Sequence, residues 1–103
     1  MLTVTATLTV KAGQEHVFER IMRMAVPKVR EEPGNHVYSV QRSTQDPRLF
    51  MFHEVYEDQA ALEAHYAHLS TMGLDLHALL DESPHWIFHD TVISSEGDNL
   101  WAD

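Results

Sequence analysis

The chain has 103 residues, and sixteen acidic against seven basic side chains give a formal net charge of −9, which disfavours binding to the phosphate backbone of a nucleic acid. It contains no cysteine, which excludes disulfides, thiolate nucleophiles and zinc–sulfur sites. It has no apolar run near the roughly 20 residues of a membrane helix and no N-terminal signal pattern, so we expect a cytoplasmic protein without membrane contact.

The N-terminal third predicts a strand followed by a helix. Residues 2–10 alternate strictly between aliphatic residues and threonine, which is typical of a strand with one aliphatic face. An apolar stripe over 17–29 predicts a helix, within which Pro27 should cause a kink or end the regular part. The sequence Glu-Pro-Gly-Asn at 32–35 breaks helices, so the helix ends before it.

Two strands joined by a turn are predicted next, over 36–44 and 49–57, with the turn at 46–48. Alternation divides the second strand into two faces. One face carries Phe50, Phe52, Glu54 and Tyr56, and the other carries Met51, His53 and Val55. Asp58 then offers a carboxylate that can cap a helix N-terminus.

The helix that follows Asp58 carries a histidine on its apolar face, because His65 lies among apolar residues at helical spacing. A second short helical segment is expected over 74–80, and Pro84 ends it before a last strand over 85–93. A histidine among apolar side chains is either a hydrogen-bonded core residue or the working group of a pocket. The spacing alone leaves both interpretations open.

The element order β-α-β-β-α-β predicts a ferredoxin-like α+β fold, with an antiparallel sheet covered by helices on one face. We expect a single domain over 1–93 and an acidic tail over 94–103. Several strands are apolar on both faces, which predicts a face-to-face homodimer, with Trp101 as a clasp across it. His53 and His89 would lie on that dimer face, where added charge near pH 6 would weaken association.

Four motifs resemble those of one family. They are Val10-Lys-Ala-Gly13, Glu32-Pro-Gly34, Phe52-His-Glu-Val-Tyr-Glu-Asp58 and Ala61-Leu-Glu-Ala-His65. In these motifs the chain resembles the antibiotic biosynthesis monooxygenase family of dimeric α/β barrels, over nearly its whole length. Members of that family include quinol and anthrone monooxygenases that use no cofactor, haem-degrading enzymes, and an isomerase of a phosphorylated sugar.

The resemblance implies a cavity between the sheet and the helices. Its expected lining is Ala6, Phe52, Glu54, Tyr56, Leu62, His65 and His77. The haem-degrading members have an asparagine near the position of Ala6 and a tryptophan at that of His65, so haem degradation is disfavoured. The anthrone oxygenases have an asparagine where Phe52 stands and a tyrosine where Leu62 stands. An apolar pocket with histidine as the base is closest to the quinol-oxidising type.

The chemistry expected from this resemblance is oxidation of a small aromatic hydroquinone or phenol by molecular oxygen, without a cofactor or metal. His65 would be the base, with Tyr56 and His77 as its hydrogen-bond partners. Phe52, Leu62 and Trp86 would contact the substrate. Glu54 would orient a histidine or carry the proton away.

Other interpretations remain for the same residues. Tyr56 and Phe52 could serve packing alone, and His77 could be a solvated helix residue. The chain could be a ligand-binding barrel without catalysis, or an isomerase of a small phosphorylated metabolite. The sequence lacks a His-Glu-x-x-His pattern or another close cluster typical of a metal site.

Overall fold

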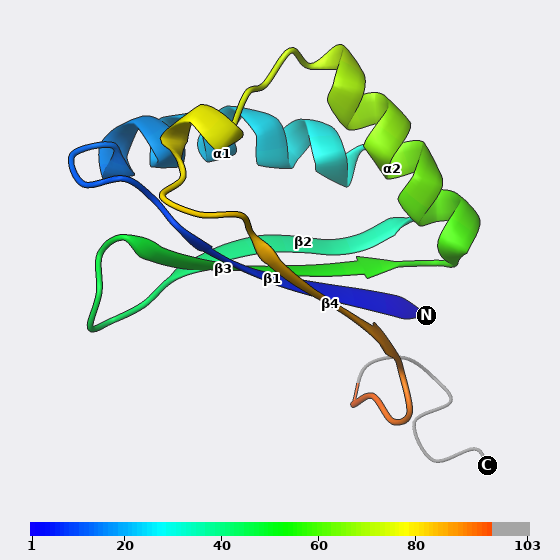
Figure 1. The fold of residues 1–103 in the computed structure, drawn as a ribbon. Helices are drawn as coiled ribbons and strands as arrows, with labels where there is room; N and C mark the ends of the chain where they lie inside the picture. Colours follow the sequence, from blue (N-terminus) through cyan, green and yellow to red (C-terminus); the bar gives the residue numbers. More distant parts are fainter. Residues whose placement is uncertain (96–103) are drawn as a thin grey trace.

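The computed structural model describes residues 1–95. Its elements follow in the order β1 (Leu2–Thr9), α1 (Glu15–Arg30), β2 (Asn35–Arg42), β3 (Leu49–Tyr56), α2 (Gln59–Thr71), a 3₁₀ turn η1 (His77–Leu79) and β4 (His85–Asp90). The sheet has the strand order β2-β3-β1-β4 with every neighbouring pair antiparallel, and both helices lie on one of its faces (Figure 1). The predicted ferredoxin-like α+β fold is confirmed.

The first helix, α1, continues through Pro27 to Arg30 and ends before the breaker at 32–35, as the apolar stripe predicts. Two other element boundaries differ from those expected. The segment expected to be helical over 74–80 forms only the turn η1, because Gly73 leaves α2 with φ 66° and Leu80 is extended to bridge to Val10. The last strand ends at Asp90 rather than 93.

The end of β4 coincides with the end of its pairing with β1. Asp90 stands opposite Leu2, the first residue of β1, and Thr91 N then donates a last backbone hydrogen bond to Met1 O at 3.3 Å. The tail from 96 onward, including Trp101, lies outside the described residues.

The face of the sheet beneath the helices forms the core, as the alternation predicts. Its buried side chains from β1 and β3 are Val4, Ala6, Leu8, Phe50, Phe52, Glu54 and Tyr56. From α1, Phe18 packs on Phe50 and Phe52, with ring centroids 4.6 and 6.1 Å apart. The helices leave the β4 edge less covered, since Phe88 remains 54% exposed on this face.

No element within residues 1–95 covers the opposite face of the sheet. This face carries the four threonines of β1 together with Met51, His53, Val55 and Ile87, all half-buried or exposed. The chain that follows β4 borders this open face and leaves beside it a hollow of about 790 Å³. The sheet therefore has two candidate functional surfaces, the face beneath the helices and the open face.

Candidate active site

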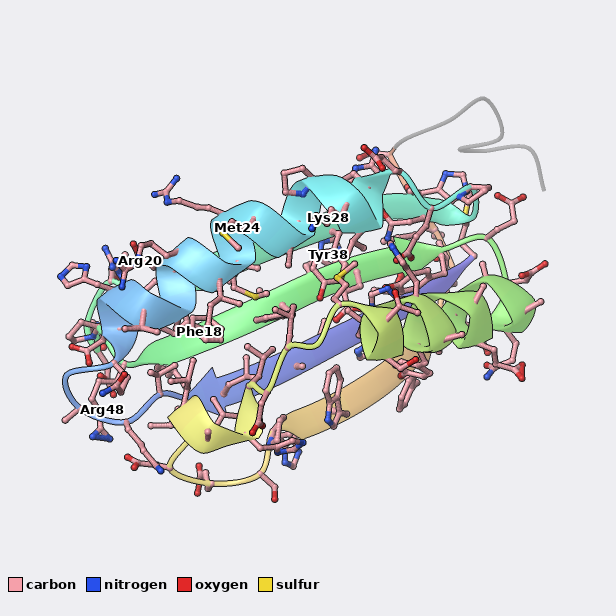
Figure 2. All side chains as sticks on the ribbon, turned by 90° about the horizontal axis from the view of Figure 1, so that it is seen from above. Phe18, Arg20, Met24, Lys28, Tyr38 and Arg48 are labelled. Atoms are coloured by element: carbon pink, nitrogen blue, oxygen red, sulfur yellow. The ribbon has the colours of Figure 1, made fainter. Side chains whose placement is uncertain are left out.

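A cavity of about 230 Å³ lies between α2, the segment that follows it, and the covered face of the sheet. Its walls are mainly apolar and aromatic. The lining residues are Leu8, Met22, Tyr38, Phe52, Glu54, His65, Tyr66, Leu69, Leu74, Leu76, His77, Leu80, Pro84 and Trp86. Viewed from above, Tyr38 lies between the two helices (Figure 2).

The structure brings five of the seven predicted site residues to this cavity. They are Phe52, Glu54, His65, His77 and Trp86. Tyr56 and Leu62 do not line it, because both pack with Val4 in a separate buried cluster toward the start of β1. Tyr56 still contacts a lining residue, because its hydroxyl donates a hydrogen bond to Glu54 Oε1 at 2.8 Å.

Ala6, the small residue expected to line the cavity from the first strand, is buried in the main core but is not among the lining side chains. From β1, Leu8 reaches the cavity instead. Both point to the covered face, so the difference is one of position along the strand and not of strand phase.

His65 is buried, with 1% of its surface exposed, and a carboxylate holds one side of its ring. Its Nδ1 lies 3.0 Å from both carboxylate oxygens of Glu32. An ionised carboxylate can only accept hydrogen bonds, so Nδ1 must carry the proton. In the neutral ring Nε2 then keeps its lone pair, and this is the arrangement of a carboxylate-oriented histidine base.

Sequence analysis did not single out Glu32, which appeared only as part of a helix-breaking cluster and a family motif. The residue is 33 positions from His65, and the turn after α1 brings the two together. Gly34 makes this approach possible, because a Cβ at Gly34 would lie 2.3 Å from Ala61 Cβ on α2. The backbone of Glu57 also donates to Gly34 O at 2.8 Å and ties the turn to the end of β3.

Glu32 also binds a second histidine on the same helix. His68 Nδ1 lies 2.7 Å from Glu32 Oε2, and the His68 side chain is 38% exposed. One carboxylate therefore links a buried histidine to one that reaches solvent.

Glu54 places a second carboxyl group beside His65, with its Oε1 3.8 Å from His65 Nε2. Burial is the main cause that raises the pKa of Glu54 from 4.5 to about 7, and the charge of Glu32 raises it further. The hydrogen bond from Tyr56 opposes this by stabilising the charged form. Glu54 can therefore exchange a proton near neutral pH.

Tyr38 contributes a hydroxyl that sequence analysis did not identify. Its ring packs on His65 and Phe52, with centroids 5.4 and 5.8 Å away. Burial, followed by the charges of Glu54 and Glu32, raises the pKa of Tyr38 far above 10, so the hydroxyl stays neutral. The alternation of β2 would have put Tyr38 on the covered face, but only its contact with α2 shows that it reaches the cavity.

The cavity has no cationic side chain other than histidine, since no lysine or arginine occurs among the described residues that line it. Over residues 1–95 no three histidine, aspartate or glutamate side chains are arranged as a metal site. No helix in that range is long and apolar enough to cross a membrane.

Comparison with known proteins identifies the family. The model of the antibiotic biosynthesis monooxygenase family matches residues 1–70. A search of curated proteins finds no match. Among solved structures, an antibiotic biosynthesis monooxygenase is 27% identical with a TM-score of 0.76, over 89% of this chain and 99% of that one.

Two further structures have the same fold. PA3566 from Pseudomonas aeruginosa is 30% identical, with a TM-score of 0.73 over 87% of this chain and 94% of that one. Rv0793 from Mycobacterium tuberculosis is 15% identical, with a TM-score of 0.83 over 92% and 98%. PA3566 is similar to this chain in sequence as well as in fold. With a family match over residues 1–70, the chain belongs to the antibiotic biosynthesis monooxygenase family.

Proposed function

We propose that this protein is a cofactor-independent monooxygenase that oxidises a small hydroquinone or phenol in the cavity beneath α2. The observation that carries the proposal is the contact between Glu32 and His65 Nδ1 at 3.0 Å, because it leaves Nε2 as a base in a buried aromatic cavity. A base with this orientation can remove a hydroxyl proton, and it contributes roughly 10²–10⁴-fold to the rate of such reactions.

The volume of the cavity favours a substrate with one ring. An apolar cavity of about 150 Å³ is enough to bind benzene. The 230 Å³ found here holds one substituted ring but leaves little room for the three fused rings of an anthrone. Phe52 and Trp86 offer aromatic surface to such a ring.

The reaction needs only the substrate as the electron donor. His65 Nε2 removes a hydroxyl proton, and the phenolate passes one electron to O₂ to give a semiquinone and superoxide. The two radicals form a C–O bond beside the hydroxyl, and the imidazolium protonates the resulting peroxide. Loss of the proton on that ring carbon breaks the O–O bond, forms a carbonyl and releases water.

The overall balance is one dihydroxybenzene and one O₂ to one hydroxyquinone and one water. The ring loses four electrons, and O₂ gains all four. The apolar walls on the sheet side limit contact of the radical pair with water, while Tyr66 and Trp86, which also line the cavity, are 44% and 45% exposed. Among the described lining residues, the neutral hydroxyl of Tyr38 and the ring of His77 can donate to a developing oxyanion, as can the hydroxyl of Tyr66 and the indole N–H of Trp86.

The proposal includes a homodimer formed through the open face of the sheet. Ile87 is 47% exposed there and Met51 is 39% exposed. A second copy of the same open face would cover both apolar side chains.

The phosphorylated-metabolite alternative finds less support in the cavity. A phosphate needs cationic side chains, and the described lining residues offer only histidines beside Glu54. The ligand-binding alternative uses the same cavity and differs only in the absence of turnover.

The test is oxygen uptake with single-ring hydroquinones and phenols, followed with ¹⁸O₂ to detect label in the product. We expect uptake and one labelled oxygen per product, and roughly a 10²–10⁴-fold loss in His65→Ala. His16→Ala is the matched control, because His16 is exposed on α1 and does not line the cavity.

Three other outcomes would revise the proposal. Full activity in His65→Ala would move the base to Glu54 or His77. Hydrogen peroxide without label in the product would indicate an oxidase. Absence of uptake with every substrate would favour the ligand-binding alternative.

A further inference from the structure

Two hydrogen-bond acceptors face the cavity side by side. His65 Nε2 and Glu54 Oε1 are 3.8 Å apart, which is too long for a direct hydrogen bond between them. Both side chains are buried and both line the cavity. Each acceptor is therefore free to receive a donor from a ligand.

The partners behind these two atoms leave both of them able to accept a hydrogen bond. Glu32 holds the proton on His65 Nδ1, which leaves the lone pair on Nε2. Tyr56 occupies one lone pair of Glu54 Oε1 at 2.8 Å, and a carboxylate oxygen can accept a second hydrogen bond. The Tyr56 contact also limits the rotation of the Glu54 carboxyl group.

The spacing of the acceptors selects among dihydroxybenzenes. Hydroxyl oxygens on adjacent ring carbons are about one hydrogen-bond length apart, ~2.8 Å, so two bonds of similar length can diverge slightly to reach acceptors 3.8 Å apart. Hydroxyls at opposite ends of a ring cannot reach both atoms at once. A ring with one hydroxyl leaves one acceptor unpaired, which costs binding energy in a buried site.

The charge of the cavity adds a second restriction. Glu54 and Glu32 are both acidic, and no lysine or arginine occurs among the described residues lining the cavity. A carboxylate or phosphate on the ligand ring would be repelled. The aromatic faces of Tyr66 and Trp86 suit a neutral ring.

We infer that the site is specific for neutral rings with two hydroxyls on adjacent carbons, bound between His65 Nε2 and Glu54 Oε1. This inference rests on the proposed function for the identity of the base, and it narrows the substrate class to catechols. The same four-electron balance then gives a hydroxylated ortho-quinone and water.

Anaerobic binding tests the inference without turnover. Trp86 lines the cavity, and Trp101 is the second of two tryptophans, so Trp101→Phe provides a background in which fluorescence reports only on Trp86. The ligands are catechol, resorcinol, hydroquinone, 2-methoxyphenol and 3,4-dihydroxybenzoate. We expect catechol to bind about tenfold more tightly than hydroquinone, 2-methoxyphenol and 3,4-dihydroxybenzoate, because none of these satisfies both acceptors without adding a negative charge. Binding of resorcinol as tight as that of catechol would overturn the assignment of the two hydroxyls to adjacent carbons.

A variant pair sharpens the result. Glu54→Gln keeps the shape but removes the charged acceptor, so the preference for catechol over hydroquinone should fall to about twofold. Glu63→Gln, an exposed position on α2, should keep the full preference. If Glu54→Gln does not fold, the affinities of the ligand series for the Trp101→Phe protein still test whether the site prefers catechol.

The outcomes separate this inference from the proposed function. Equal affinities for catechol and hydroquinone would overturn the specificity, even if both are oxidised. Tight, selective binding of catechol without oxygen uptake would support the specificity and overturn the monooxygenase proposal.

Discussion

On the face of the sheet beneath α1 and α2, every second residue of β1 and β3 except Leu2 is buried, and this face borders a cavity lined by one carboxyl group, Glu54, and two histidines, His65 and His77. On the other face, the intervening residues of the same strands are half-buried or exposed, and no element of the described chain covers them. The same four strands supply both faces.

The difference shows how strand alternation assigns proton chemistry to one face of the sheet and leaves the other face for association. Burial on the covered face gives Glu54 an altered proton affinity and holds His65 in one orientation. The open face has threonines, histidines and a few apolar residues, which suit association better than chemistry. Substitutions on the covered face should therefore leave self-association unchanged, and substitutions on the open face should leave catalysis unchanged. The four predictions below test that separation.

The largest effect is expected for the pH dependence of stability through Glu54. Its pKa is about 7 in the folded protein against 4.5 as the ordinary value, so the folded state holds a proton that the unfolded state releases. The contribution of Glu54 to the free energy of unfolding should thus be largest below about pH 4.5 and should fall by ~3 kcal/mol as the pH rises to 7. Urea denaturation at pH 4.5 and 8 should show this fall in wild type and not in Glu54→Gln.

Glu63→Gln is the control for that measurement, because Glu63 is exposed and should follow wild type. Identical pH profiles for wild type and Glu54→Gln would show that Glu54 titrates as an ordinary surface carboxyl group.

The second prediction concerns Glu32 on the covered face. Glu32→Gln removes the charge that stabilises the imidazolium and allows the wrong tautomer of His65, so kcat should fall roughly 10–100-fold with little change in KM. Oxygen-uptake kinetics measure both constants. Glu31→Gln, at the exposed neighbouring position, should retain wild-type values, and a KM effect alone in Glu32→Gln would contradict a role in orienting the base.

The third prediction moves to the open face. Ile87→Lys should weaken self-association at least about tenfold, because the ammonium group would lose water on burial against a second copy. Sedimentation velocity measures the association, and circular dichroism should remain unchanged. Met24→Lys, at a 63% exposed position on α1, should leave the association intact. A monomeric wild type would refute the proposed dimer.

The smallest effect is expected from His53 and His89 on the same face. His89 Nε2 lies 3.0 Å from Thr5 Oγ1, and Thr5 is paired with His53 across β1 and β3, so the two histidines are close neighbours. Histidines gain charge in mildly acidic solution, so association should weaken a few-fold between pH 7.5 and 5.5. The double variant His53→Gln, His89→Gln should lose this dependence.

Most of the fold could be predicted from local patterns. The period-two alternation of β1 and β3 assigned their faces correctly, and Asp58 caps α2 as expected by accepting from Ala61 N at 2.9 Å. The segment after α2 was predicted less well, because leucine spacing alone does not show that Gly73 ends the helix and that Leu80 pairs with Val10.

The candidate site was only partly predictable. Strand and helix phase were sufficient to place Glu54 and His65 on facing surfaces. They were not sufficient to separate Tyr56 from Phe52, which share a face of β3 although only Phe52 lines the cavity. Which residue along a strand reaches a cavity depends on where α2 crosses the sheet, and no short-range pattern encodes that position.

The sequence by itself determined the order of the elements, the buried face of each strand and the apolar surroundings of His65, because these follow from periodicities within a few residues. Only the tertiary structure decided that Glu32 orients His65, that Glu54 lies 3.8 Å from its other nitrogen and that Tyr38 completes the wall. These contacts join residues from 11 to 33 positions apart, and they form only when the turn at Gly34 packs on α2 and α2 packs on the sheet.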